Sequence, residues 1–299
     1  MFICNVKFLT SDILFISEKM TVCSGVICEK GKRVIVVSDR MWTQKYLSVE
    51  FEHEEPKIQN INDFCVVATA GNVVAPTELI ENAKTEIKKK NIQNIGEIAE
   101  IIKKYYAKER NKRIEDEYFV PRGLTIKDFY KSGVQSTIYP NIVTRLDQII
   151  ETYDQFQLEI LVAGIDDTGG HLYVVFSPGR LESFDRIGYI SIGTGSPHVE
   201  STFILNGFKR EWNLEKSLYV TYEGKKLAQK APGVGVASDL VVIDENSGIT
   251  EIKKDTLKQL DSIFLDKTKS KGLEDDEIQR KINDLKIFEE KINADGNRR

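Results

Sequence analysis

The feature that most constrains this chain is a pair of β-branched segments close to its start. Residues 21–28 (TVCSGVIC) and 33–38 (RVIVVS) are rich in Val, Ile, Thr and Cys, and they flank the turn sequence EKGK. Two such segments around a Gly-containing turn predict a β-hairpin. The second segment runs on into the tripeptide SDR, and the dipeptide Met-Thr stands directly before the first. A hairpin alone does not require a threonine after a methionine at that point, so the dipeptide needs another explanation.

Further along the chain, strand patterns and helix patterns follow one another in blocks. Strands are expected over 56–62, 63–71, 158–166, 171–179, 181–193 and 238–252, and helices over 75–90, 95–105, 140–156, 198–206 and 215–229. The strands are followed by hairpin turns more often than by crossover helices. This order predicts an α+β fold with antiparallel sheets layered against helices, rather than a doubly wound parallel sheet.

The 299-residue length favours one large domain with appendages. We expect that domain to span 21–252, with a charged insertion over 107–136 that contains one short helix. A highly charged helical extension is expected over 253–299, either packed on its own domain or binding a partner, because a narrow apolar stripe runs along 278–292. Residues 1–20 resemble a signal peptide only loosely, which leaves a short pro-segment or an upstream start codon with Met20 as the initiator.

Composition argues against several classes of function. The net charge is −4 and the pI about 5.7, with both signs interspersed, so we expect no nucleic-acid partner. No apolar run approaches a membrane span. The cysteines Cys4, Cys23, Cys28 and Cys65 lack paired spacing, which is typical of reduced thiols in a cytoplasmic protein. The histidines His53, His171 and His198 are scattered and do not predict a metal site.

Three blocks of the sequence together resemble the proteasome β-subunit family of N-terminal nucleophile (Ntn) hydrolases. They are MTVCSGVICEKGKRVIVVSDR, PKIQNINDFCVVATAGNVVAPTELIE and the segment from YISIGTGS to SDLVVID. Each motif is weak alone, but their order over residues 21–251 is much more specific. The resemblance implies a four-layer αββα sandwich, with two antiparallel sheets between two helical layers.

The resemblance also implies roles for individual residues. Thr21 would be the nucleophile once its α-amino group is free, and that group would accept the hydroxyl proton. Lys57 would supply a buried cation. Asp39 would be its acidic partner, although a register shift of one residue would put Ser38 there unless a β-bulge intervenes. Gly71 would donate the oxyanion-hole N–H, and Thr194 would replace the family serine near the amine.

The sequence KAPGVGVASDL departs from the family pattern. Ala231 and Val234 occupy the places where active members usually have an acid and a serine, while Ser238 and Asp239 follow inside the next strand. Cys23 has no evident base and is a poor candidate nucleophile.

We therefore expect an N-terminal-threonine amide-bond hydrolase, a proteasome-like peptidase. It would act in the cytoplasm on peptide or protein substrates as a ring or other homo-oligomer, without metal or organic cofactor, and an unfoldase is a candidate partner. The alternatives are a non-catalytic structural subunit of the same fold, and an acyl transferase or amidase of that fold.

Overall fold

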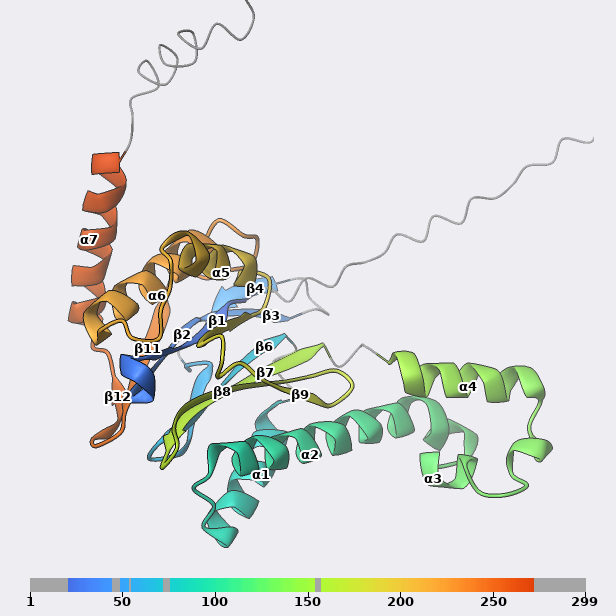
Figure 1. The fold of residues 1–299 in the computed structure, drawn as a ribbon. Coiled ribbons are helices and arrows are strands. Elements are labelled where there is room, and N and C mark those ends of the chain that lie inside the picture. The colour runs from blue at the N-terminus through green and yellow to red at the C-terminus, as the bar shows by residue number, and fades with distance from the viewer. Residues whose placement is uncertain (1–20, 45–48, 54, 72–75, 154–156, 272–299) are drawn as a thin grey trace, which may run out of the picture. The chain divides into compact units, whose positions relative to one another are not determined.

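Two antiparallel sheets of five strands each form the centre of the fold (Figure 1). The computed structural model describes residues 21–44, 49–53, 55–71, 76–153 and 157–271. The first sheet has the order β10-β1-β2-β11-β12 and the second β5-β6-β7-β8-β9, with every strand pair antiparallel. The predicted α+β class with antiparallel sheets is confirmed.

The first sheet contains the hairpin predicted at the start. Its strands are β1 (Cys23–Cys28), β2 (Arg33–Asp39), β10 (Tyr189–Ile192), β11 (Ser238–Asp244) and β12 (Gly248–Glu251). Every residue of β1 is buried, and so are six of the seven in β2. Continuous rather than alternating burial shows that this sheet is covered on both faces.

The second sheet is formed by β5 (Ile58–Asn62), β6 (Cys65–Gly71), β7 (Leu158–Asp166), β8 (Gly169–Phe176) and β9 (Arg180–Ser183). Apolar side chains of both sheets meet in one core, to which Ile27 and Val36 of the first sheet and Leu161 and Leu172 of the second belong. The sheets approach closely at Gly25, where a Cβ atom would lie 2.7 Å from the Leu172 side chain.

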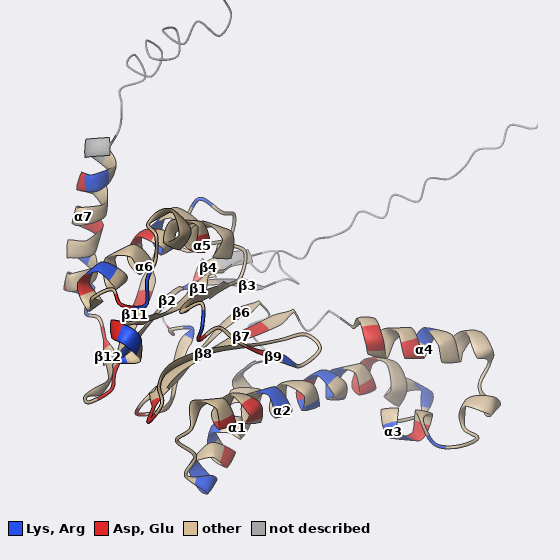
Figure 2. Cartoon of the chain, in the orientation of Figure 1, with Lys and Arg blue, Asp and Glu red and all other residues tan. Residues whose placement is uncertain are grey.

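Helices cover the outer face of each sheet. The helices α1 (Pro76–Lys90) and α2 (Ile95–Ile114) share a core with β6 and β7, whereas α5 (Ser196–Leu205) and α6 (Leu214–Ala228) contact β1 or β10 of the first sheet. Figure 1 shows the two helix pairs on opposite sides of the sheets. Acidic and basic residues are mixed along α1, α2 and α6 (Figure 2).

Two features differ from the sequence analysis. No strand was expected between the first hairpin and residue 56, but β3 (Met41–Gln44) pairs there with β4 (Val49–Glu52). The expected strand 181–193 is two strands, because β9 ends at Ser183 in the second sheet and β10 begins at Tyr189 in the first.

The expected insertion begins inside a helix. Helix α2 continues through 107–114, where Arg110 is buried and donates hydrogen bonds to the backbone oxygens of Ile150 and Tyr153. A π-helical turn, the short helix α3 (Ile126–Phe129) and helix α4 (Pro140–Thr152) follow. Because residues 107–114 are highly charged, the sequence did not predict that the helix continues there. Its contacts with Ile150 and Tyr153 hold this part of the helix in place.

The chain divides into two compact units, Met1–Ile252 and Lys253–Arg299. In the second unit the structure describes one helix, α7 (Lys254–Lys271), which lies within the extension expected to be helical. The apolar stripe over 278–292 and residues 1–20 lie outside the described residues. Within the described part of the chain, no helix is both long enough and apolar enough to cross a membrane.

Candidate active site

Three of the predicted site residues meet in one buried cluster beside the start of β1. The Thr21 hydroxyl donates a hydrogen bond to Asp39 Oδ1 and accepts one from Lys57 Nζ, and Lys57 Nζ also lies 2.7 Å from Asp39 Oδ1. The side chain of Lys57 is 6% exposed and that of Asp39 0%. A buried ion pair of this kind makes a positioned cation available to the hydroxyl oxygen.

Asp39 is the acid of the cluster, and no bulge is needed to bring it there. Strand β2 pairs with β1 and with β11 without a register shift, and Asp39 N donates to Val22 O at 3.1 Å. The neighbouring hydroxyl, Ser38 Oγ, is buried and has no hydrogen-bond partner among the described residues. The pairing of β2 shows no β-bulge, and Asp39 nevertheless contacts Thr21 and Lys57.

Main-chain donors hold the Asp39 carboxylate on both of its oxygens. Val22 N donates to Oδ1 at 3.1 Å, while Met41 N and Gly235 N donate to Oδ2 at 3.1 Å and 2.9 Å. Hydrogen bonds from N–H groups stabilise the ionised form of a carboxylate. The acid is thus fixed in position by groups from the residue before β1, from β3 and from the loop before β11.

Lys57 lies directly before β5, at the edge of the second sheet. The adjacent Ile58 is 6% exposed and belongs to the core between the sheets, which directs this end of the strand inward. An isolated buried ammonium is costly unless it is paired, and Asp39 supplies the paired charge.

A turn after β10 holds the backbone of Thr21. Thr21 N donates to Thr194 Oγ1 at 3.3 Å, Thr194 Oγ1 lies 3.4 Å from Thr21 O, and Gly195 N donates to Thr21 O at 3.2 Å. Gly193 precedes them with φ of 87°, and a Cβ there would lie 2.3 Å from Thr21 O. The close approach requires glycine, and it places Thr194 beside the nitrogen that the predicted mechanism uses.

Sequence reasoning missed a contact between this turn and the second sheet. Gly193 N donates to Glu159 Oε2 at 3.0 Å, and Glu159 pairs with Ala70 in the sheet. A single carboxylate in a strand gives no signal for this partnership in the sequence.

Gly71 ends β6 and has a backbone reason to be glycine. Its φ is 106°, and a Cβ would lie 1.7 Å from Gln157 O. The residue is paired with Leu158 at the end of β7. Its role as an oxyanion donor stays a prediction, since the backbone alone already requires glycine at this position.

The loop over residues 231–237, whose sequence departs from the family pattern, also contacts the cluster, through its main chain. Val234 is 7% exposed, and its side chain is among the closest atoms to a Cβ placed on Gly195. Gly235 N is the donor to Asp39 Oδ2 described above. Asp239 lies beyond the loop in β11 and pairs with Arg40, with Arg40 Nε 2.9 Å from both of its carboxylate oxygens. It therefore does not take the place of the acid missing at Ala231.

Cys23 lies near the cluster without the properties of a nucleophile. It is fully buried, its Sγ is 3.4 Å from Thr69 O, and burial raises the pKa of the thiol to about 12 despite the nearby Lys57 cation. A protonated thiol is unreactive at neutral pH. Across the described ranges, no three His, Cys, Asp or Glu side chains gather in a way that would hold a metal ion.

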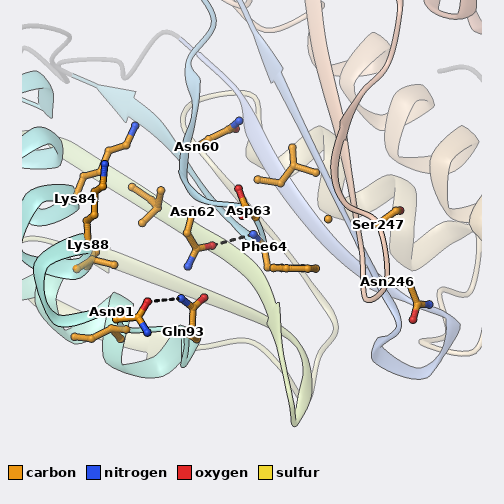
Figure 3. A pocket seen from close by; sticks show the side chains of 15 residues that line it. Asn60, Asn62, Asp63, Phe64, Lys84, Lys88, Asn91, Gln93, Asn246 and Ser247 are labelled. Atoms are coloured by element: carbon orange, nitrogen blue, oxygen red, sulfur yellow. Dashed lines mark hydrogen bonds between the residues drawn. The ribbon is translucent and has the colours of Figure 1, made fainter.

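A separate cavity of about 730 Å³ lies among the β5–β6 turn, the end of α1 and the β11–β12 turn (Figure 3). Its polar lining includes Asn60, Asn62, Lys84, Lys88, Asn91 and Asn246. None of the lining residues belongs to the cluster around Thr21. The cavity therefore has no part in the chemistry proposed for that cluster.

Comparison with known proteins gives one partial similarity. Proteasome subunit beta 2 of Pyrobaculum calidifontis is 35% identical over 97 residues, which are 32% of this chain and 46% of that protein. The chain thus spans about half the length of the relative it matches. No family model matches the sequence. The similarity supports a relationship at the level of proteasome-like proteins, in agreement with the family that the motifs resemble.

Proposed function

We propose that this chain is an N-terminal-threonine amide-bond hydrolase, a proteasome-like peptidase. The observation that carries the proposal is the contact of one threonine hydroxyl with both members of a buried Lys57–Asp39 ion pair. In this proposal the two sheets and their helical coverings form the four-layer αββα sandwich of Ntn hydrolases. The domain spans 21–252, with residues 1–20 before it as a leader or a mis-assigned start, and with the extension 253–299 after it.

The proposed reaction begins when the Met20–Thr21 bond is cut and Thr21 N becomes a free amine. The Thr21 hydroxyl oxygen attacks the substrate carbonyl carbon and forms an ester, while its proton passes to the amine. The proton then goes to the leaving nitrogen as the substrate C–N bond breaks. Water hydrolyses the ester and restores the hydroxyl. An α-amine has a reference pKa of about 8, so it is an effective base at neutral pH.

The neighbouring groups divide the remaining work. The Lys57 cation stabilises the negative charge that develops on the hydroxyl oxygen, and Asp39 holds that cation in place. Thr194 orients the amine through the contact already present at Thr21 N. Gly71 N–H is the proposed donor to the oxyanion. We also propose that the protein acts in the cytoplasm as a homo-oligomer, with an unfoldase as its possible partner.

One observation favours a second candidate, a non-catalytic subunit of a proteasome-like assembly. Ala231 and Val234 bring no polar side chain to the loop next to Thr21, so the amine would lack two hydrogen-bonding groups that active members usually have. Acyl transfer to an amine by the same nucleophile is the remaining alternative.

Hydrolysis of a fluorogenic peptide panel, combined with intact-mass analysis, tests the proposal. Active protein should begin at Thr21. We expect Thr21→Ala to abolish turnover and Thr21→Ser to retain measurable turnover, because serine keeps both hydroxyl and amine. Thr85→Ala on the exposed face of α1 is the matched control, with wild-type rates expected.

The same variants distinguish the routes to a free amine. If the Met20–Thr21 bond is cut by the protein itself, Thr21→Ala accumulates a chain heavier by residues 1–20. If Met20 is the initiator, both forms are short and differ only by the substitution. A correctly processed protein without turnover, or a Thr21→Ala variant as active as wild type, would refute the hydrolase proposal.

A further inference from the structure

The loop that supplies Gly235 to Asp39 cannot fix its own shape through side chains. Residues 231–237 have the sequence APGVGVA, which contains no side-chain hydrogen-bonding group. Two glycines make its backbone permissive. Any side-chain hydrogen bond that holds the backbone around the Gly235 N–H group must therefore come from outside the loop.

Lys225, near the end of α6, is the principal such group. Its side chain is 0% exposed, and its Nζ lies 3.0, 2.8 and 2.9 Å from the backbone oxygens of Gly235, Val236 and Ala237. A lysine ammonium has three donors, and three consecutive carbonyls match them in number. Hydrogen bonds from a charged donor are stronger than neutral ones, so this contact is a firm anchor for the loop.

Gly235 connects the anchor to the candidate active site. Its carbonyl accepts from Lys225, and its N–H donates to Asp39 Oδ2 at 2.9 Å. The other oxygen of Asp39 contacts Thr21 and Lys57. The contacts run without a gap from Lys225 through the backbone of one residue, Gly235, and one carboxylate to the proposed nucleophile.

We propose that Lys225 is a positioning residue for the reaction, which sets the orientation of Asp39 by fixing the 235–237 backbone. This inference rests on the proposed hydrolase function. A loop without polar side chains at 231 and 234 can still support the site, because a buried lysine from the preceding helix holds its main chain. Lys225 itself touches neither the hydroxyl nor the substrate.

The test compares Lys225→Met with Lys230→Met, which removes an exposed lysine five positions further on. Both are measured in the processed full chain by peptide hydrolysis and by hydrogen exchange of the 231–239 segment. For Lys225→Met we expect kcat to fall on the order of tenfold or more with KM changed less than about twofold, as for loss of precise orientation. Its segment should exchange faster, while Lys230→Met should match wild type in both measurements.

A split between kcat and KM, together with a conservative variant, separates positioning from a general loss of stability. Lys225→Gln retains N–H donors and should recover part of both kcat and exchange protection. If Lys225→Met fails to fold, the Gln variant decides. A folded Gln variant with intermediate kcat and protection supports the proposal, and one with wild-type values in both overturns it.

The remaining outcomes keep this inference distinct from the hydrolase proposal. If the wild type turns over peptides and Lys225→Met has the same kcat and the same exchange of residues 231–239, only the proposed role of Lys225 is overturned. If the processed wild type has no turnover, the hydrolase proposal fails and the role in catalysis fails with it. Hydrogen exchange then still shows whether Lys225 holds the loop.

Discussion

Replacing Lys57 by methionine is the most informative perturbation of the cluster, since methionine keeps much of the length and removes the charge. Two effects are expected, one on stability and one on turnover. Asp39 would remain fully buried without its cationic partner. Breaking a buried ion pair by removing one partner typically costs about 3–5 kcal/mol of the free energy of unfolding.

The contacts of Asp39 place the expected stability loss below that range. Three main-chain N–H groups, from Val22, Met41 and Gly235, still donate to its carboxylate after the substitution. Each such bond offsets part of the cost of a buried charge, and we expect a loss of about 2–3 kcal/mol. A domain with a typical stability of about 5–15 kcal/mol remains folded after that loss.

Turnover should fall much further than the folded fraction. Loss of one positioned electrostatic group typically costs on the order of 100-fold in kcat, or about 2.7 kcal/mol of transition-state stabilisation. The assay is fluorogenic-peptide hydrolysis at 25 °C, with urea unfolding of the same preparations and Lys230→Met as the control. Full turnover in a folded Lys57→Met protein would show that this lysine does not act on the Thr21 hydroxyl, and the proposed mechanism would fail.

Three other predictions follow from particular contacts. The hydrogen bond from His171 to Asp185, followed by the charges of Asp185 and Asp166, raises the pKa of His171, although burial opposes this effect. The stabilisation that protonated His171 gives the fold is therefore complete below the ordinary pKa of 6.5. It is lost as the pH rises through the raised pKa. His171→Gln should therefore lose about 1–2 kcal/mol of unfolding free energy near pH 5.5 and less near pH 9, and an equal loss at both would contradict this pairing. Gly193→Ala should abolish turnover and lower Tm, because a Cβ would lie 2.3 Å from Thr21 O, and normal activity would show that the turn adopts another form. Burial raises the pKa of Cys23 to about 12, that of Cys28 to about 11, and that of Cys65 above its ordinary value. Mass mapping should therefore find that iodoacetamide at about pH 7.5 modifies these thiols only after the protein unfolds. Rapid labelling of Cys23 in the native protein would contradict its burial.

The parts of the site that could be predicted from sequence are those with local signals. The β-branched residues on both sides of a turn predict the first hairpin. The blocks that contain Thr21, Asp39 and Lys57 follow one another in the order that the resemblance to the proteasome β-subunit family implies. The choice between Ser38 and Asp39 could not be made, because the sequence does not show which of the two side chains reaches Thr21 and Lys57. The hydrogen bonds of the Asp39 carboxylate with both residues place Asp39 in the cluster.

Lys225 could not be found from sequence for a different reason. On an amphipathic helix a lysine is normally a solvated residue, and α6 carries a second lysine beside it. Its partners are main-chain carbonyls, which every residue possesses, so no residue type marks them. The same applies to Arg110, whose carbonyl partners lie 40 and 43 residues downstream and hold the end of α2.

For glycines, the sequence marks the position but does not show the reason for it. Gly71 was expected to be glycine so that substrate could approach its N–H group, but its φ of 106° and the nearby Gln157 carbonyl require glycine without any substrate. Gly193 received no role in the sequence analysis, yet it allows the turn to approach the Thr21 carbonyl. A glycine reports a backbone constraint, and only the three-dimensional contacts say whether that constraint serves chemistry or folding.

The cluster around Thr21 exists in a chain whose threonine nitrogen is still part of the Met20–Thr21 peptide bond. An amide nitrogen is not a base, whereas the amine released by cleavage is. The contacts of the hydroxyl with Lys57 and Asp39 are already present in the uncut chain, so the proposed switch from inactive to active chain is a change in proton affinity at one nitrogen. We therefore expect the uncut chain to be folded with the same ion pair but unable to turn over peptides. Native protein that retains residues 1–20 and still hydrolyses peptides at the processed rate would refute the N-terminal nucleophile mechanism, even with every contact of the cluster intact.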